Sequence, residues 1–144
     1  MKKLKVYVAG SIPERTARAI PVIAALRASG VEITFDWTID IQVDSNADDS
    51  DSALTDEVRR RCAEADADGV RRADLLLLLA PDERGASGAW VEFGMALALG
   101  IPVVVSGAKA RRTIFTSLAQ RTFDTDDEAV AHLASPLAGT EVSK

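Results

Sequence analysis

Leu-Leu-Leu-Leu-Leu-Ala, at residues 75–80, is the stretch that decides the fold of this chain. An apolar run of this length without a helical period is typical of a strand buried on both faces, at the centre of a parallel sheet. Asp74 precedes the run, and Pro81 opens a loop after it. Parallel strands need long crossovers, usually helical, so we expect strands and helices to alternate on either side.

The rest of the chain follows this alternation. Short apolar segments predict four further strands, at residues 4–9, 31–35, 101–105 and 121–123. Segments of helical period predict a helix ending at Ala28, before Gly30, and others over about 53–72, 88–99 and 126–134. Pro21 lacks the donor that a helix interior needs, so the first helix either begins near Arg18 or is kinked. Five strands with intervening helices predict a flavodoxin-like, doubly wound α/β sheet.

The composition is that of a single domain. The 144 residues are 47% hydrophobic and only 5% aromatic, so the core must consist mainly of Ala, Val, Leu and Ile. We expect residues 1–135 to form this domain and residues 136–144 to be a loose tail. The acidic stretch at 44–52 predicts a solvated loop, with a lid over a site as the alternative.

Charge and hydropathy narrow the class of partner. With 17 Lys and Arg against 22 Asp and Glu, the net charge of −5 opposes binding to long nucleic acid. No apolar run approaches the roughly 20 residues that span a bilayer, and no signal peptide opens the chain. Cys62 is the single cysteine and has no internal disulfide partner, which fits a reducing cytoplasm. We expect a cytoplasmic domain that contacts neither membranes nor long nucleic acid.

Common catalytic and metal motifs are missing from the sequence. His132 is the single histidine and lacks a nucleophile-elbow motif, so a Ser-His-Asp triad is disfavoured. The acidic residues from Asp44 resemble the start of a calcium loop, but Asp49 replaces the required glycine and Thr55 the bidentate glutamate. Cys62 and His132 are too few for a zinc site, and no Walker or GxGxxG motif occurs. We therefore expect no metal and no cofactor.

The predicted sheet directs attention to the loops after its strands, because ligands of such sheets bind beyond the carboxyl ends of the strands. These loops contain Gly10-Ser11-Ile12, residues 35–37 and residues 81–88. In the last of them, Ser87 and Gly88 lead into a helix N-terminus, whose free N–H groups favour an anion or a sugar hydroxyl. The alternative is that they are ordinary turn and capping residues.

Two carboxylates occupy unusual helical positions. Glu92 shares a stripe with Gly88 and Met95, which should face the sheet, so we expect its pKa to be raised by burial. Asp66 lies at the edge of the apolar stripe of its helix, whereas Asp68 belongs to a solvated charge cluster. A capping or surface role is the alternative for Glu92.

Several short motifs recur here with a joint spacing that is fairly specific. They are Val-Tyr-Val-Ala-Gly-Ser at 6–11, Asp66 eight residues ahead of Asp74, Gly-Ala-Trp-Val-Glu-Phe-Gly at 88–94 and Ala-Leu-Gly-Ile-Pro-Val at 98–103. Over roughly residues 5–133, the chain resembles the nucleoside 2-deoxyribosyltransferase family. The resemblance implies a flavodoxin-like fold and cleavage of the N-glycosidic bond of a 2'-deoxynucleoside or its 5'-monophosphate.

The resemblance also implies catalytic roles. Glu92 would attack the anomeric carbon and form a glycosyl-enzyme, Tyr7 would orient Glu92, and Asp66 would handle the proton of the base. A retaining displacement needs a nucleophilic carboxylate and a separate acid/base group, which agrees with the two unusual carboxylates. The deoxyribosyl group would pass to another base, as in a transferase, or to water, as in a hydrolase.

The chain departs from the family pattern near the sugar. The transferases usually carry an Asp six residues before the nucleophile, where this chain has Ala86. The related deoxynucleoside 5'-monophosphate N-hydrolases have a Ser there and share the Gly-Ser-Ile of residues 10–12, whereas the serine here is displaced to Ser87. By that resemblance a phosphate would rest on Ser11, Ser87 and Gly88, with Thr116 or Ser117 of a neighbouring subunit and with positive charge from Arg15 and Arg84.

Two tryptophans and the expected assembly complete the sequence-based hypotheses. Trp37 is the preferred candidate for stacking on a base, and Trp90 either stacks or packs in a subunit interface. The family forms homo-oligomers, so we expect a homodimer or a larger assembly. A hydrolase of deoxynucleoside or ribonucleoside 5'-monophosphates and a non-catalytic nucleotide-binding module remain the alternatives.

Overall fold

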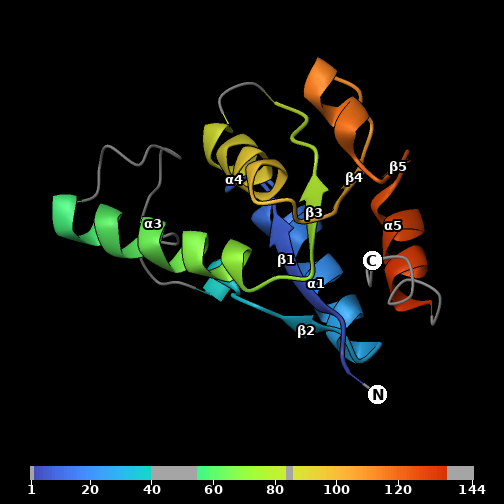
Figure 1. Ribbon diagram of the computed structural model, residues 1–144, viewed down its shortest axis with the longest axis horizontal. Helices are drawn as coiled ribbons and strands as arrows, with labels where there is room; N and C mark the ends of the chain where they lie inside the picture. Colours follow the sequence, from blue (N-terminus) through green and yellow to red (C-terminus); the bar gives the residue numbers. More distant parts are fainter. Residues whose placement is uncertain (1, 40–54, 84–85, 136–144) are drawn as a thin grey trace.

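The computed structural model describes residues 2–39, 55–83 and 86–135. Over these residues the strands form one sheet in the order β2-β1-β3-β4-β5, with all neighbouring strands parallel (Figure 1). The strands are β1 (Lys5–Ala9), β2 (Glu32–Ile33), β3 (Leu75–Leu79), β4 (Val103–Ser106) and β5 (Arg121–Phe123). The direction of strand progression reverses between β1 and β3, which confirms the predicted flavodoxin-like, doubly wound α/β fold.

Helices cover both faces of the sheet. They are the π-helical turn η1 (Arg15–Ala19), α1 (Ile20–Ala28), the 3-10 turn η2 (Trp37–Ile39), α3 (Asp56–Arg71), α4 (Ser87–Ala98), the 3-10 turn η4 (Ile114–Leu118) and α5 (Asp126–Ala134). Right-handed crossovers that run in opposite directions along the sheet place α1 and α4 on opposite faces. Accordingly, α1 packs with α5, and α3 packs with α4 (Figure 1).

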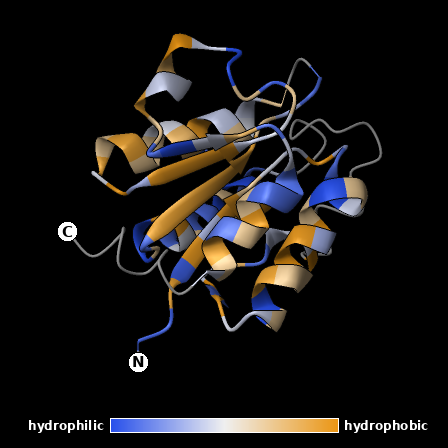
Figure 2. Cartoon of the chain, turned by 90° about the vertical axis from the view of Figure 1, so that its right-hand side faces the viewer, coloured by the Kyte–Doolittle hydropathy of each residue, from blue (hydrophilic) through white to orange (hydrophobic). Residues whose placement is uncertain are grey.

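The core lies between these layers and is built from small and branched apolar side chains. All five leucines of β3 are buried, as are the valines at the centre of β1 and β4. Figure 2 shows hydrophobic strands in the interior and helices with one hydrophilic side. Because the strands are parallel, the loops that follow β1, β3 and β4 lie along the same edge of the sheet.

The structure resolves the question that Pro21 raises. The α-helix begins at Ile20 and holds Pro21 in its first turn, where the missing N–H costs no helical bond. The π-helical turn η1 precedes it, so α1 is shorter than a helix from Arg18 would be. Gly30, with φ of +87°, ends the helix as predicted.

β2 is shorter than the predicted strand over residues 31–35. Glu32 and Ile33 pair with β1, and the N–H of Thr34 still donates to the Val6 carbonyl at 3.0 Å. The Thr34 carbonyl, however, accepts from the Arg72 guanidinium at 2.7 Å, and its hydroxyl donates to the Gly69 carbonyl. The chain leaves the sheet at this point because side chains and α3 take over its hydrogen bonds.

Some sequence-based expectations fall on residues outside the described ranges. They are the acidic loop at 44–52, Arg84, and the tail at 136–144. Within the described ranges, no helix is long and apolar enough to cross a membrane.

Candidate active site

Tyr7 is the residue of β1 that points toward the layer of α3 and α4. Its side chain is fully buried, and its hydroxyl donates to Oε2 of Glu92 at 2.5 Å. Burial, followed by the charges of Glu92 and Asp66, raises the pKa of Tyr7 well above its usual value. The phenol therefore stays protonated and acts as a fixed hydrogen-bond donor to the carboxylate.

Glu92 lies one turn into α4 and is 9% exposed. It shares the buried face of the helix with Ala89 and Ala96. Gly88, which the helical spacing places on the same stripe, is instead exposed, and Met95 is half-buried, so the buried face is turned slightly from the predicted one. Burial raises the pKa of Glu92 well above its usual value, and the nearby charge of Asp66 adds to this effect. The Tyr7 hydroxyl acts in the opposite direction, because it donates to the ionised carboxylate.

Asp66 approaches this pair from α3 and is half-buried. A hydrogen bond between the Asp66 and Glu92 side chains further raises the pKa of Glu92. Because the charge of Asp66 raises the pKa of Glu92, the two carboxyl groups cannot both be ionised at low cost. The structure thus brings Tyr7, Glu92 and Asp66 together from three elements that are far apart in the sequence.

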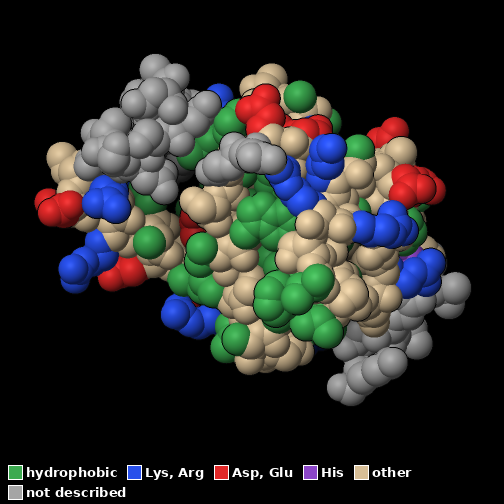
Figure 3. All heavy atoms as spheres, turned by 90° about the horizontal axis from the view of Figure 1, so that it is seen from above, with side chains coloured by type: hydrophobic (Ala, Val, Ile, Leu, Met, Phe, Trp, Pro, Cys, Tyr) green, Lys and Arg blue, Asp and Glu red, His purple; other side chains and the backbone are tan. Residues whose placement is uncertain are grey.

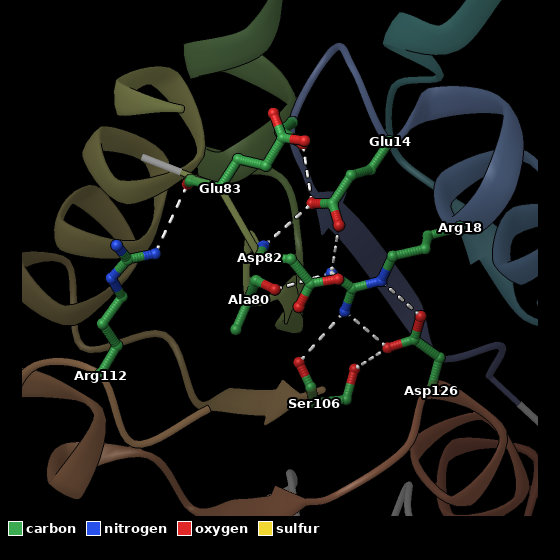
Figure 4. Close-up of polar contacts among 9 residues, drawn as sticks. Glu14, Arg18, Ala80, Asp82, Glu83, Ser106, Arg112 and Asp126 are labelled. Atoms are coloured by element: carbon green, nitrogen blue, oxygen red, sulfur yellow. Dashed lines mark hydrogen bonds and ion pairs between the residues drawn. The ribbon is translucent and has the colours of Figure 1, made fainter. Parts of the chain in front are cut away.

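A second polar cluster lies at the carboxyl ends of β3 and β4 and centres on Arg18 of η1 (Figure 4). Its guanidinium forms two bonds to Asp126, at 2.8 and 2.9 Å, and donates to the Ala80 carbonyl at 2.7 Å. It also pairs with Glu14 at 3.1 Å. Gly107 follows β4 with φ of +113°, a conformation that favours glycine, and a Cβ there would lie 2.6 Å from the Arg18 guanidinium.

Glu14 connects this cluster to the loop after β1. Its Oε1 accepts from the Ser11 hydroxyl at 2.8 Å and from the Asp82 backbone N–H at 3.4 Å. Burial alone would raise the pKa of Glu14, but hydrogen bonds from Ser11, Asp82 and Arg18 hold it below its usual value. Sequence reasoning missed both Glu14 and Arg18, although a glutamate three residues after Ser11 is a capping-like pattern that could have drawn attention.

The predicted ligand-binding residues at the sheet edge differ in burial and in hydrogen bonding. Ser11 is buried with its hydroxyl bonded to Glu14, and Ile12 packs against the core. Gly10 lies beside Trp37, since a Cβ there would be 3.6 Å from the indole. Ser87 and Gly88 are exposed at the start of α4, whose N-cap residue makes no side-chain bond, so this helix end is open.

The two tryptophans and Ser117 make contacts within this chain. Trp37 is 6% exposed and its indole N–H donates to the Val8 carbonyl at 2.8 Å, so it packs in the core against β1. Trp90 packs edge-on against Phe93. Ser117 is exposed on η4, where its hydroxyl donates to the Ile114 carbonyl at 2.6 Å.

Two further sequence-based candidates are engaged within the chain. Arg15 donates to the Thr38 carbonyl at 2.6 Å, and Thr116 is buried with its hydroxyl on the Thr113 carbonyl. Across residues 2–39, 55–83 and 86–135, no group of three or more His, Cys, Asp or Glu is arranged to hold a metal ion. The reactive groups that the structure brings together at this site are the two carboxyl groups and the phenol.

The fold and the buried Tyr-Glu-Asp cluster define a flavodoxin-like α/β domain with a carboxylate site beneath the carboxyl edge of its sheet. The model of the nucleoside 2-deoxyribosyltransferase family matches residues 6–138, and the chain belongs to this family. The match spans nearly the whole chain, as the sequence motifs predict.

A solved structure supports the fold. The crystal structure of a conserved protein from Enterococcus faecalis V583 matches with a TM-score of 0.62 and 21% sequence identity. The match covers 92% of this chain and 98% of that one. At this identity the likeness supports the fold alone. The comparison with curated proteins gave no match.

Proposed function

We propose that this chain is a nucleoside 2-deoxyribosyltransferase that cleaves the N-glycosidic bond of a 2'-deoxynucleoside through a covalent intermediate on Glu92. The observation that carries the proposal is the Tyr7 hydroxyl on Glu92 Oε2, with Asp66 beside the same carboxyl group. A buried carboxylate with its own donor and a neighbouring acid supplies both groups that a retaining displacement needs.

The reaction begins with one proton shared by Asp66 and Glu92. When this proton resides on Asp66, Glu92 is ionised and is held by the Tyr7 hydroxyl. A Glu92 oxygen then attacks the anomeric carbon, the bond from that carbon to the base nitrogen breaks, and its electron pair leaves with the base. Asp66 donates its proton to the departing base, which balances the charge.

The second step reverses the first with a different base. A nitrogen of the incoming base attacks the anomeric carbon, the ester bond to Glu92 breaks, and the Asp66 carboxylate takes the proton of the new base. Water in place of the base gives hydrolysis with the same groups. The shared proton pair is restored in both cases, so the enzyme needs no cofactor for this cycle.

The surroundings of Ser11 favour a free nucleoside over its 5'-monophosphate. The Ser11 hydroxyl donates a hydrogen bond to the Glu14 carboxylate, which also accepts one from the backbone of the loop that leads to α4. Among the described cations near this loop, Arg18 is engaged with Asp126, Glu14 and a backbone carbonyl. A phosphate dianion beside these carboxylates would be repelled, whereas the open N-terminus of α4 still accepts a sugar hydroxyl.

The exposed apolar surface supports a homo-oligomer, in which we place a second copy of this chain over η4 and α4. Phe115 and Leu118 are more than half exposed beside a groove of about 740 Å³ that also contains Trp90. Figure 3 shows hydrophobic side chains gathered in the middle of this face, with Lys and Arg side chains at their margin. Patches of this kind mark interfaces. The groove contains Trp90 of α4, the helix that also carries Glu92, so a second copy docked there would bring its Ser117 to this helix.

Chromatography of free bases tests the proposal. Each of the four deoxynucleosides and their 5'-monophosphates is incubated with the protein, with and without adenine as acceptor. Exchange of base on nucleosides supports the proposal, and release without acceptor identifies a hydrolase. Glu92→Gln should abolish turnover, whereas Glu64→Gln, an exposed carboxylate of α3, should not. No reaction with any substrate would contradict the proposal and favour a binding module.

A comparison of two variants tests the preference for nucleosides. Glu14→Gln removes one negative charge near a bound phosphate, worth at least about 1 kcal/mol, so monophosphate turnover should rise severalfold. Glu83→Gln removes an exposed charge from the loop between β3 and α4 and should change little. Faster turnover of monophosphates than nucleosides by the unmodified chain would contradict this preference.

A further inference from the structure

We propose that Gly69 is a positioning residue: its missing side chain lets α3 lie directly on the ring of Tyr7 and thereby fixes the Tyr7 hydroxyl on Glu92. Its geometry comes from the contacts between α3 and β1, and its kinetic consequence rests on the proposed function.

The space at Gly69 is smaller than a methyl group. A Cβ built on Gly69 would lie 2.8 Å from the Phe35 Cβ and 2.9 and 3.0 Å from two ring atoms of Tyr7. Contacts this short do not occur between real side chains, so one of the groups would have to move. The Phe35 Cβ is fixed to the backbone, and the Tyr7 ring is fully buried.

Two hydrogen bonds oppose a retreat of the helix. The Thr34 hydroxyl donates to the Gly69 carbonyl at 2.7 Å, and Arg72 donates to the Thr34 carbonyl at 2.7 Å. The end of α3 is therefore tied to the chain that leaves β2. With the helix held in place, an added side chain at Gly69 would press on both the Phe35 Cβ and the Tyr7 ring, and the ring would shift together with its hydroxyl.

Glycine is otherwise a poor choice at this position. It lies within α3 near its end, where alanine would be favoured by conformational entropy. The glycines of α4 differ, because a Cβ at Gly88 or Gly94 would meet nothing within 4 Å. The close approach to Tyr7 is thus a physical reason for glycine at position 69.

The kinetic expectation follows from the hydroxyl bond. Gly69→Ala displaces the Tyr7 hydroxyl from Glu92, and misplacement of a catalytic group by about 1 Å costs roughly 100-fold in rate. The loss should fall on kcat and leave KM nearly unchanged, since neither residue is expected to bind the base. In a Tyr7→Phe background the hydroxyl is absent, so Gly69→Ala should cost no more than about threefold.

Ala63→Gly is the matched control. It lies on the exposed side of the same helix and weakens α3 without touching the ring. It should leave kcat and KM unchanged. Equal losses from Gly69→Ala in both backgrounds, or no loss at all, would overturn the proposal.

A second readout does not depend on turnover. In carbon-13 NMR spectra of protein labelled at glutamate carboxyls, with the Glu92 signal assigned through Glu92→Gln, the Glu92 titration midpoint reports the Tyr7 bond. Gly69→Ala should move that midpoint to higher pH, as Tyr7→Phe does, and Ala63→Gly should not. An unchanged midpoint, or one at lower pH because Asp66 has moved away, would overturn the proposal.

If Gly69→Ala does not fold, Thr34→Val is the alternative variant for the titration. It removes the hydrogen bond onto the Gly69 carbonyl and should move the Glu92 midpoint in the same direction by a smaller amount. An unmoved midpoint in Thr34→Val would overturn the proposal. Inactivity of the unmodified chain toward every nucleoside would contradict the proposed function, whereas the titration still decides the role of Gly69.

Discussion

Replacing Tyr7 with phenylalanine removes one hydroxyl and keeps the buried ring, so it isolates the bond to Glu92 Oε2. Hydrogen bonds to a charged group contribute about 1.5–3 kcal/mol, and about 1.4 kcal/mol corresponds to one pH unit. Burial and Asp66 already raise the pKa of Glu92, while the Tyr7 hydroxyl lowers it. Loss of the hydroxyl should therefore raise that pKa by a further one to two pH units, roughly.

The sign of the kinetic effect follows from the role of Glu92. The nucleophile must be ionised, so kcat/KM falls as the pH drops through the pKa of Glu92. In Tyr7→Phe the acidic limb of the profile should move to higher pH, with the largest loss of activity in mildly acidic solution and partial recovery in alkaline solution. The exposed-carboxylate variant Glu64→Gln should leave the limb in place.

The assay is the initial rate of base exchange on a deoxynucleoside at low substrate concentration, measured from acidic to alkaline pH and followed by chromatography of the bases. A limb that stays fixed in Tyr7→Phe, or moves to lower pH, would refute the assigned role of the Tyr7–Glu92 bond. A uniform loss at all pH values would also refute it, because the bond would then act on something other than the ionisation of Glu92.

Three further predictions concern stability and assembly. Glu92→Gln should lose turnover yet raise the melting temperature, and this gain should grow with pH. The reason is that the stability contributed by a carboxyl group of raised pKa is lost as the pH rises through the pKa of the folded state. Thermal scans at acidic and alkaline pH check this, and a lower melting temperature of the variant in alkaline solution would contradict it. Arg18→Met should lower the free energy of unfolding by about 3 kcal/mol in neutral solution, because it leaves Asp126 without its cation. Burial would raise the pKa of Asp126, but Arg18 holds this pKa below its usual value. The loss of stability, measured in urea titrations, should therefore shrink as the pH falls through the pKa of Asp126 in the folded state. Phe115→Glu should turn the proposed homo-oligomer into monomers in sedimentation measurements, and an unchanged mass would show that η4 is not the interface.

Much of the fold could be predicted because it depends on local pattern. The leucines of β3 are apolar without a helical period, and that pattern alone identifies the central strand. The bounds of β5 and α5 agree with the predicted ranges 121–123 and 126–134, because Thr125 and Glu128 form a capping box that starts the helix. The end of β2 could not be predicted, since Arg72, far along the chain, takes the carbonyl of Thr34.

In the candidate site, too, some residues could be predicted from local spacing and others could not. Glu92 could be predicted from spacing, because a carboxylate on the apolar stripe of a helix must face the core. Tyr7 sits between two valines of a strand and gives no local sign, so only the resemblance indicates it. The partner of Arg18 could not be predicted, since Asp126 lies 108 residues away and meets it only through the packing of α5 on α1.

The central claim is that Glu92 becomes glycosylated. Mass spectrometry of the protein, quenched soon after mixing with a deoxynucleoside and digested, tests it most directly. The account predicts a deoxyribosyl group on the peptide that contains Glu92, which disappears when acceptor base is added and never forms in Glu92→Gln. Continued base exchange by Glu92→Gln, or a deoxyribosyl group on another residue, would contradict it.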